Sequence, residues 1–163
     1  MSLLPGDKAP SFELFDTEKK KVSLEDFRGR NVLILFFPLA FTSVCTAELC
    51  GVRDNIAMYQ NTDAAVLGIS VDSLYTLGKF KAEQHLNFPL LSDFNKTVSS
   101  AYGSLYATFG YGMMGVSKRS AFVIDKEGFI RYAEVLENAG EQPDFAAIQA
   151  ALQGLNQGNL EKL

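Results

Sequence analysis

Cysteine and histidine are scarce in this chain, which has two cysteines and one histidine. The cysteines form no Cys-x-x-Cys pair, and no cluster of cysteine with histidine is present, so we expect no zinc site. His85, the single histidine, stands at the end of a predicted helix. We therefore favour a capping or surface position for it over a role as the base in a Cys–His nucleophile pair.

Long apolar runs and basic stretches are also missing. No apolar run approaches the roughly 20 residues that a transmembrane helix needs, and the start of the chain lacks the basic and apolar segments of a signal peptide. The net charge of −4 argues against a nucleic-acid partner, which calls for a basic face. The loop with Gly110, Gly112 and Gly115 lacks the lysine of a phosphate-binding P-loop. We expect a cytoplasmic protein with no membrane or nucleic-acid partner, no cofactor and no metal.

Internal repeats, low-complexity tracts and linkers are absent from the 163 residues. A chain of this length fits one domain, and it buries enough surface on folding to need no disulfide or metal for stability. The sequence therefore predicts a single domain over residues 1–163.

Hydrophobic patterning predicts alternating strands and helices. The apolar run 31–37 is typical of a strand buried on both faces, and the residues after it show helical spacing to about Gln60. Alternation of polar and apolar residues predicts a hairpin of residues 11–15 with 22–24. This order of elements favours an α/β protein with a thioredoxin-like fold, a mixed central sheet with helices on both faces, extended by an N-terminal hairpin. The other predicted elements are strands 64–71, 120–125 and 129–135, the extended segment 87–92, a helix at 73–85 and a final helix opened by Pro143.

Both cysteines lie where the first long strand is followed by a helix, and α/β proteins usually build their chemistry at such a junction. Cys45 falls at the start of this helix, whose partial positive charge and free amide N–H groups favour a thiolate over a thiol. A thiolate is nucleophilic, and a peroxide oxidises it to a sulfenic acid. Thr42 is placed to direct its hydroxyl to the same point, while Pro38 stiffens the loop and shields the sulfur. On these residues alone, a buried cysteine that only packs is an equal alternative.

The spacing Pro38-x-x-x-Thr42-x-x-Cys45 at the end of an apolar strand resembles the active-site motif of the peroxiredoxins, thiol peroxidases of the AhpC/TSA type. The similarity covers nearly the whole chain, including residues 5–12 and 27–29. In that family the cysteine attacks a hydroperoxide, while the threonine hydroxyl and the cysteine amide hold the peroxide oxygens. The resemblance implies a thiol-dependent peroxidase that reduces hydrogen peroxide and organic hydroperoxides.

The resemblance also implies an arginine that lies just before a strand in the second half of the chain. Arg119 fits this position, although an arginine in such a place is usually a solvated surface residue. Its role would be to stabilise the thiolate and the charge that moves onto the peroxide oxygen. Glu48, one helical turn after Cys45, is interpreted as an orienting partner of Arg119; the alternative is a first-turn acid favoured by the helix dipole. Arg53 is interpreted as a surface residue.

Cys50 is the only other thiol, and the family offers two precedents for it. The Cys-x4-Cys spacing matches the bacterioferritin-comigratory (Q-type) peroxiredoxins, whose second cysteine resolves the sulfenic acid as an intramolecular disulfide. The loop sequence is closer to the one-cysteine, AhpE-like branch. Residues i and i+5 of a regular helix have Cα atoms about 8.5 Å apart, beyond the roughly 7 Å limit of a disulfide. If Cys50 resolves, the helix must therefore unwind locally, and a thioredoxin- or glutaredoxin-like donor then reduces the disulfide; packing is the alternative role.

Other functions and assemblies stay open at this point. A thioredoxin-fold sensor or binding protein would oxidise Cys45 without useful turnover. A one-cysteine peroxidase would depend on an external thiol, and a dithiol disulfide reductase is disfavoured because Cys-x-x-Cys is missing. A group of apolar residues suits either a rim for bulky hydroperoxides or the interface of a homodimer; the group comprises Phe41, Phe109, Tyr111, Met113 and Met114.

Overall fold

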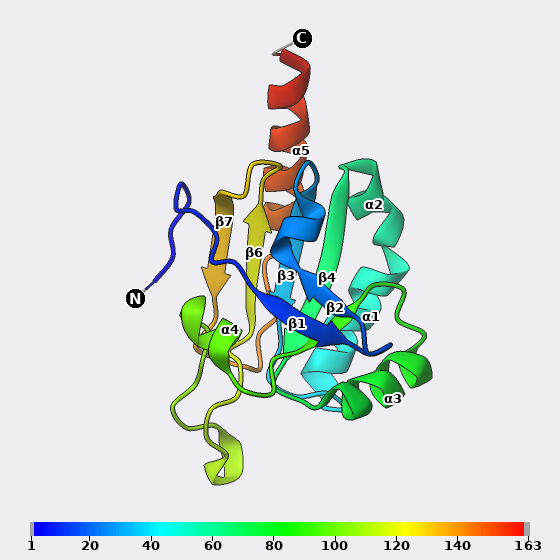
Figure 1. The fold of residues 1–163 in the computed structure, drawn as a ribbon, viewed down its shortest axis with the longest axis vertical. Helices are drawn as coiled ribbons and strands as arrows, with labels where there is room; N and C mark the ends of the chain where they lie inside the picture. Colours follow the sequence, from blue (N-terminus) through cyan, green and yellow to red (C-terminus); the bar gives the residue numbers. More distant parts are fainter. Residues whose placement is uncertain (1, 162–163) are drawn as a thin grey trace.

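The computed structural model describes residues 2–161, which form a central sheet flanked by helices (Figure 1). In this part of the chain the strands lie in the spatial order β2-β1-β5-β4-β3-β6-β7, and no helix is both long and apolar enough to cross a bilayer. The strands are β1 Glu13–Asp16, β2 Lys21–Ser23, β3 Asn31–Phe36, β4 Ala64–Ser70, β5 Leu90–Ser92, β6 Ser120–Ile124 and β7 Ile130–Val135. The helices are α1 Ser43–Asp54, α2 Ile56–Asn61, α3 Leu74–Gln84, α4 Thr97–Ala101 and α5 Phe145–Glu161, with short 3₁₀ helices η1 Leu24–Phe27 and η2 Gly110–Gly112.

The sheet is mixed. Strands β3, β4 and β5 run parallel, and helices make both crossovers: α1 and α2 lie between β3 and β4 in the chain, and α3 lies between β4 and β5. The remaining pairs are antiparallel, with β1 between β2 and β5 and with β6 between β3 and β7. The predicted mixed sheet with an N-terminal hairpin is confirmed.

Strand β3 contributes side chains to both hydrophobic cores, one on each face of the sheet. All six of its residues are buried, as expected for a strand covered on both faces. Because side chains alternate along a strand, Leu33 and Leu35 belong to one core while Val32 and Ile34 belong to the other. The first core is completed by α1, α3 and α5 through residues such as Leu49, Val52, Leu77, Phe80, Ile148 and Leu152. The second is completed by α4 and the N-terminal segment through residues such as Phe12, Leu24, Val98 and Tyr102.

The helix predicted to run unbroken to about Gln60 is in fact two helices separated at Asn55. The backbone of Asn55 leaves the helical region, with φ −116° and ψ 20°. Its side-chain Nδ2 donates to the carbonyl oxygen of Gly51 at 2.8 Å, so the side chain ends α1 through a local hydrogen bond of the kind that competes with helix continuation. The apolar periodicity continues across the break, which is why the pattern alone predicted one helix.

Candidate active site

The loop after β3 delivers Cys45 to the first turn of α1. The chain leaves β3 at Phe36, and Thr42, with extended backbone angles, is the residue that precedes α1. Cys45 is therefore the third residue of α1, where backbone N–H groups have no acceptor within the helix. Its side chain is fully buried. The predicted position of the cysteine at a helix start is thus the position observed.

Arg119 reaches Cys45 because of the register between β6 and β3. These antiparallel strands pair Ser120 with Phe36, so the residue before β6 lies beside the end of β3 that leads into the cysteine loop. The guanidinium Nη2 of Arg119 donates to the Cys45 sulfur at 3.3 Å, although 74 positions separate the two residues in the chain. Arg119 is 2% exposed, so it is not the solvated surface residue that its sequence context would normally indicate.

The guanidinium of Arg119 is held from two further sides. Nη1 donates to Glu48 Oε2 at 2.6 Å, and this carboxylate is also completely buried. Nε and Nη2 donate to the carbonyl oxygen of Ala139 at 3.1 and 2.9 Å. A planar group fixed by a carboxylate and a carbonyl cannot rotate freely, so the donor that faces the Cys45 sulfur is positioned before any substrate arrives.

Burial shapes the electrostatics of this cluster. Removal from water raises the pKa of Glu48 to about 7, against the opposing effect of the Arg119 charge and hydrogen bond. Burial lowers the pKa of Arg119, but the charges of Cys45 and Glu48 outweigh it and the net direction is upward. The guanidinium consequently remains a cation next to the sulfur.

Pro38 and Thr42 occupy the loop between the strand and the helix. Pro38 is buried, whereas Thr42 is exposed. The Thr42 hydroxyl donates to the carbonyl oxygen of Leu39 at 2.8 Å and makes no side-chain capping bond to α1. Its hydrogen is therefore committed to the loop, and the lone pairs of Oγ1 are left to accept a hydrogen bond from another group.

Asp72 and Ser70, which the sequence analysis did not single out, hold this loop in place. The backbone N–H of Ala40 donates to Asp72 Oδ2 at 2.8 Å, and the same oxygen accepts from Ser70 Oγ at 2.7 Å. Phe41 has φ +70°, a conformation that costs a bulky residue about 1–2 kcal/mol, and its ring packs edge-on against Phe80 at 5.1 Å. A signal for Asp72 exists in the sequence, because it lies just beyond 64–71, the next predicted strand after the one that leads into the cysteine loop.

Cys50 faces a different neighbour. Its sulfur is half-buried and donates to Gln84 Oε1 at the end of α3, at 3.5 Å. Arg53 contacts the same part of α3: it pairs with Asp54 at 2.9 Å and donates to the backbone oxygen of Gln84. Both cysteines are free thiols.

The remaining candidates lie outside this cluster. His85 is exposed and ends α3 in a left-handed conformation, as a capping residue does. The described part of the chain holds no group of three or more His, Cys, Asp or Glu side chains that would suit a metal ion. Of the five predicted apolar residues, Phe41, Tyr111, Met113 and Met114 are exposed and Phe109 is half-buried.

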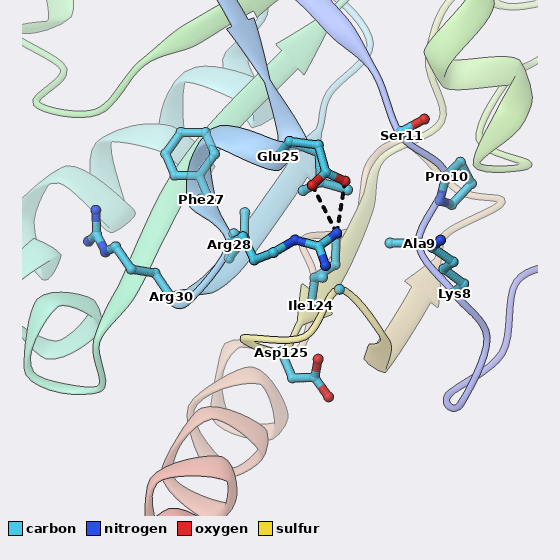
Figure 2. Close-up of a pocket in the computed structure, with 13 residues that line it drawn as sticks. Lys8, Ala9, Pro10, Ser11, Glu25, Phe27, Arg28, Arg30, Ile124 and Asp125 are labelled. Atoms are coloured by element: carbon cyan, nitrogen blue, oxygen red, sulfur yellow. Dashed lines mark hydrogen bonds and ion pairs between the residues drawn. The ribbon is translucent and has the colours of Figure 1, made fainter.

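A cavity of about 360 Å³ lies at the other end of β3 from the cysteine loop (Figure 2). The strand register pairs Val32 with Ile124 at this end, and both residues line the cavity. Figure 2 shows Glu25 and Arg28, three positions apart in the chain, joined in its lining by an ion pair, which measures 2.9 Å. This cavity is separate from the cluster around Cys45.

Comparison with known proteins identifies the family of this chain. The family model described as AhpC/TSA matches residues 5–133. The chain belongs to the AhpC/TSA family. It is 41% identical over 142 residues to alkyl hydroperoxide reductase E of Mycobacterium bovis, covering 85% of this chain and 89% of that protein. It is 43% identical over 134 residues to a protein of Mycobacterium tuberculosis named as a peroxiredoxin, covering 81% of this chain and 85% of that protein.

Solved structures agree with the sequence comparison. The crystal structure of peroxidoxin BcpB from Mycobacterium tuberculosis superimposes with a TM-score of 0.83 at 28% identity, covering 94% of this chain and 98% of that one. The predictions of a peroxiredoxin, a thioredoxin-like fold and a thiol peroxidase activity are confirmed. Names from both the reductase E and the Bcp branches occur among these relatives, in keeping with the mixed motif of the loop.

Proposed function

We propose that Cys45 is the thiolate that attacks hydrogen peroxide and organic hydroperoxides. The sulfur forms a bond to the terminal peroxide oxygen, the O–O bond breaks, and the products are a Cys45 sulfenic acid and water or an alcohol after proton transfer. The observation that carries this proposal is the hydrogen bond of 3.3 Å between Arg119 Nη2 and the Cys45 sulfur. A buried cation at this distance stabilises negative charge on the sulfur and on the oxygen that leaves.

The neighbouring residues take complementary roles in this proposal. Arg119 stabilises charge directly, and Glu48 positions Arg119 through their ion pair of 2.6 Å. Thr42, together with the amide of Cys45, holds the peroxide oxygens. Buried Pro38 keeps the loop rigid and limits the access of water to the sulfur.

We assign Cys50 as the thiol that resolves the sulfenic acid. Its sulfur displaces water from the oxidised Cys45 and forms an intramolecular disulfide, which a thioredoxin- or glutaredoxin-like dithiol then reduces by exchange. The two cysteines are five positions apart in α1, where regular geometry separates their Cα atoms by about 8.5 Å. Disulfides require less than about 7 Å, so this step needs the start of α1 to unwind.

Treatment with one equivalent of hydrogen peroxide, followed by intact-mass analysis and peptide mapping, tests both assignments. We expect the wild type to lose the mass of two hydrogen atoms and to yield a peptide that joins Cys45 to Cys50. In Cys50→Ser we expect one added oxygen on Cys45. A wild type that keeps a stable sulfenic acid and a free Cys50 would refute the resolving role and favour the one-cysteine scheme. An oxidation rate of Cys45 close to that of free cysteine would refute the peroxidatic role and favour a sensor.

We further propose a domain organisation, a cellular compartment and an oligomeric state for the enzyme. Residues 1–163 act as one domain in the cytoplasm, where reduced thiols are maintained and both cysteines are available as thiols. The exposed apolar side chains of Phe41, Tyr111, Met113 and Met114 form a contact with a second copy of the chain. Sedimentation velocity tests the dimer: Met114→Lys is expected to shift the protein toward the monomer, and an unchanged mass would refute this contact.

A further inference from the structure

A second cavity, of about 310 Å³, lies between the α1–α2 pair and the first half of α5. Its volume falls within the range of small-molecule binding sites. Apolar side chains supply much of the lining, among them Val52, Met58 and Phe145. The polar residues Glu48 and Gln149 also line it, so the cavity adjoins the carboxylate that pairs with Arg119.

Two acceptor atoms at this cavity lack donors within the described residues. They are Glu48 Oε1, the carboxylate oxygen that does not contact Arg119, and Gln149 Oε1. Buried acceptors are nearly always satisfied in folded proteins, and an unsatisfied one weakens the fold. Burial raises the pKa of Tyr59, a further lining residue; a hydrogen bond from the amide N–H of Gln149 opposes this rise, and the charge of Glu48 adds to it. The three polar side chains thus act on one another across the cavity.

We propose that this cavity is a binding site for a small neutral molecule with an apolar body and an amide or hydroxyl donor. The apolar body packs among Val52, Met58 and Phe145, and the donor satisfies Glu48 Oε1 or Gln149 Oε1. A neutral donor is favoured over a cation because the charge of Glu48 is already matched by Arg119, and a second buried cation would have no counter-charge. The cavity of Figure 2 differs in this respect, since its Arg28 and Glu25 already pair with each other.

Occupation of the cavity also affects the peroxidase chemistry. An occupant that donates a hydrogen bond to Glu48 draws negative charge from this carboxylate and weakens its ion pair with Arg119. The interaction of the guanidinium with the Cys45 sulfur then becomes stronger. Cys45 should then be oxidised faster. This consequence rests on the proposed role of Cys45, whereas the binding site itself does not.

Titrations observed by NMR at pH 8 test the site with a matched pair of probes. N-methylbenzamide carries one amide N–H, and methyl benzoate has nearly the same shape without it. We expect saturable shifts with N-methylbenzamide at a dissociation constant of about 1 mM, as is usual for molecules of this size. Methyl benzoate should bind at least about tenfold more weakly. Equal affinity for both probes, or no saturable shift with N-methylbenzamide up to about 10 mM, would overturn the proposal.

Variants that fill the cavity localise the binding. Ala146 lines the cavity, and Gly51 lines it at a helical position where an added Cβ meets no atom within 4 Å. Ala146→Leu and Gly51→Leu should each weaken N-methylbenzamide binding at least about tenfold. Gly154→Leu is the matched control, since Gly154 is equally unobstructed but lies outside the cavity. Binding that survives both filling variants, or that Gly154→Leu weakens equally, would overturn the assignment.

Two further readouts separate the binding site from its effect on Cys45. Gln149→Met removes the unsatisfied oxygen, so it should leave the melting temperature unchanged or higher while weakening N-methylbenzamide binding relative to methyl benzoate. A lower melting temperature with unchanged probe affinity would show that Gln149 was already satisfied and would overturn its role.

Saturating N-methylbenzamide should speed oxidation of Cys45 at least about twofold in the wild type and not in Ala146→Leu. Binding without a change in rate would refute the coupling alone, and a chain whose Cys45 does not react would still report binding by NMR.

Discussion

Cys45 and Cys50 lie on one helix but are bound by different parts of the protein. The sulfur of Cys45 accepts a hydrogen bond from Arg119 at 3.3 Å, whereas the sulfur of Cys50 donates to Gln84 on α3 at 3.5 Å. The end of α1 is tied to the same region, because Asn87 Nδ2 donates to the backbone oxygen of Arg53 at 3.2 Å. Formation of a disulfide must break one of these attachments. We expect the first turn to unwind, since the end of α1 keeps its contacts with α3.

Ala47→Gly should speed disulfide formation. Ala47 is exposed in the first turns of α1, so the substitution removes little packing and lowers helix stability by about 1 kcal/mol. That difference corresponds to about a fivefold larger unwound fraction, and the disulfide should form about fivefold faster once the sulfenic acid is present. Rapid quenching followed by mass spectrometry measures the two oxidation states separately.

The matched control for this variant is Ala150→Gly, which makes the same change at an exposed position of α5. It should leave the rate of disulfide formation unchanged. Equal acceleration in both variants, or in neither, would contradict unwinding at the start of α1.

Arg119→Lys should slow the oxidation of Cys45 by about 10²–10³-fold. A lysine keeps the positive charge, but its compact ammonium cannot serve the Cys45 sulfur, the Glu48 carboxylate and the Ala139 carbonyl in one planar arrangement. Because the chain has no tryptophan, rapid quenching with mass detection is the suitable assay. Arg53→Lys is the control, since Arg53 contacts Asp54 and Gln84 and should change the rate little. Similar rates in both variants would contradict a direct role for Arg119.

Local sequence patterns predicted the strand and the helix start that place Cys45. The buried strand at 31–37 and the helix start after it depend on hydrophobic spacing and helix-end chemistry, which nearby residues express in full. The pairing of Arg119 with Cys45 depends instead on the register between β6 and β3, and local sequence does not encode a contact across 74 positions. The family resemblance supplied that pair, and local physics alone favoured a surface arginine.

Three features that the sequence analysis missed depend on single side chains, on backbone groups or on the packing of helices, and hydrophobic spacing does not indicate any of these. Asn55 interrupts the predicted helix through its own side chain, although the apolar spacing continues past it. The carbonyl of Ala139 is a backbone group, and any residue type would provide it. Gln149 Oε1 faces the cavity between α5 and the α1–α2 pair and has no donor within the described residues, and no pattern within one helix indicates this.

Thr42→Val should slow the oxidation of Cys45 by about 10²-fold, and Thr42→Ser should stay close to the wild type. The Thr42 hydroxyl donates its hydrogen to the Leu39 carbonyl oxygen at 2.8 Å, so the lone pairs of Oγ1 can accept a hydrogen bond from the peroxide O–H. Valine has the same shape without this acceptor, and it removes no helix cap because Thr42 makes no side-chain capping bond. The second-order rate constant with hydrogen peroxide is the measurement. Equal rate constants in Thr42→Val and Thr42→Ser would show that the hydroxyl does not bind substrate.

Glu48→Gln should change how stability depends on pH. The pKa of Glu48 is about 7 in the folded protein because of burial, against 4.5 for an ordinary glutamate. Between these two values the folded state keeps a proton that the unfolded chain has lost, so protonation favours folding. This contribution is complete below pH 4.5 and disappears as the pH rises through 7. It amounts to about 3 kcal/mol, since one pKa unit corresponds to about 1.4 kcal/mol.

Urea unfolding at pH 5 and pH 8 separates this effect from those of other groups. The free energy of unfolding of the wild type should fall by about 2.5 kcal/mol more than that of Glu48→Gln over this interval, because glutamine does not titrate and most of the contribution of Glu48 is still present at pH 5. Glu13→Gln is the matched control: Glu13 is an exposed glutamate on β1, and its removal should leave the wild-type pH dependence in place. A difference between wild type and Glu48→Gln that is constant with pH would mean that Arg119 fully compensates the burial of Glu48, and the carboxylate would then be ionised throughout this range.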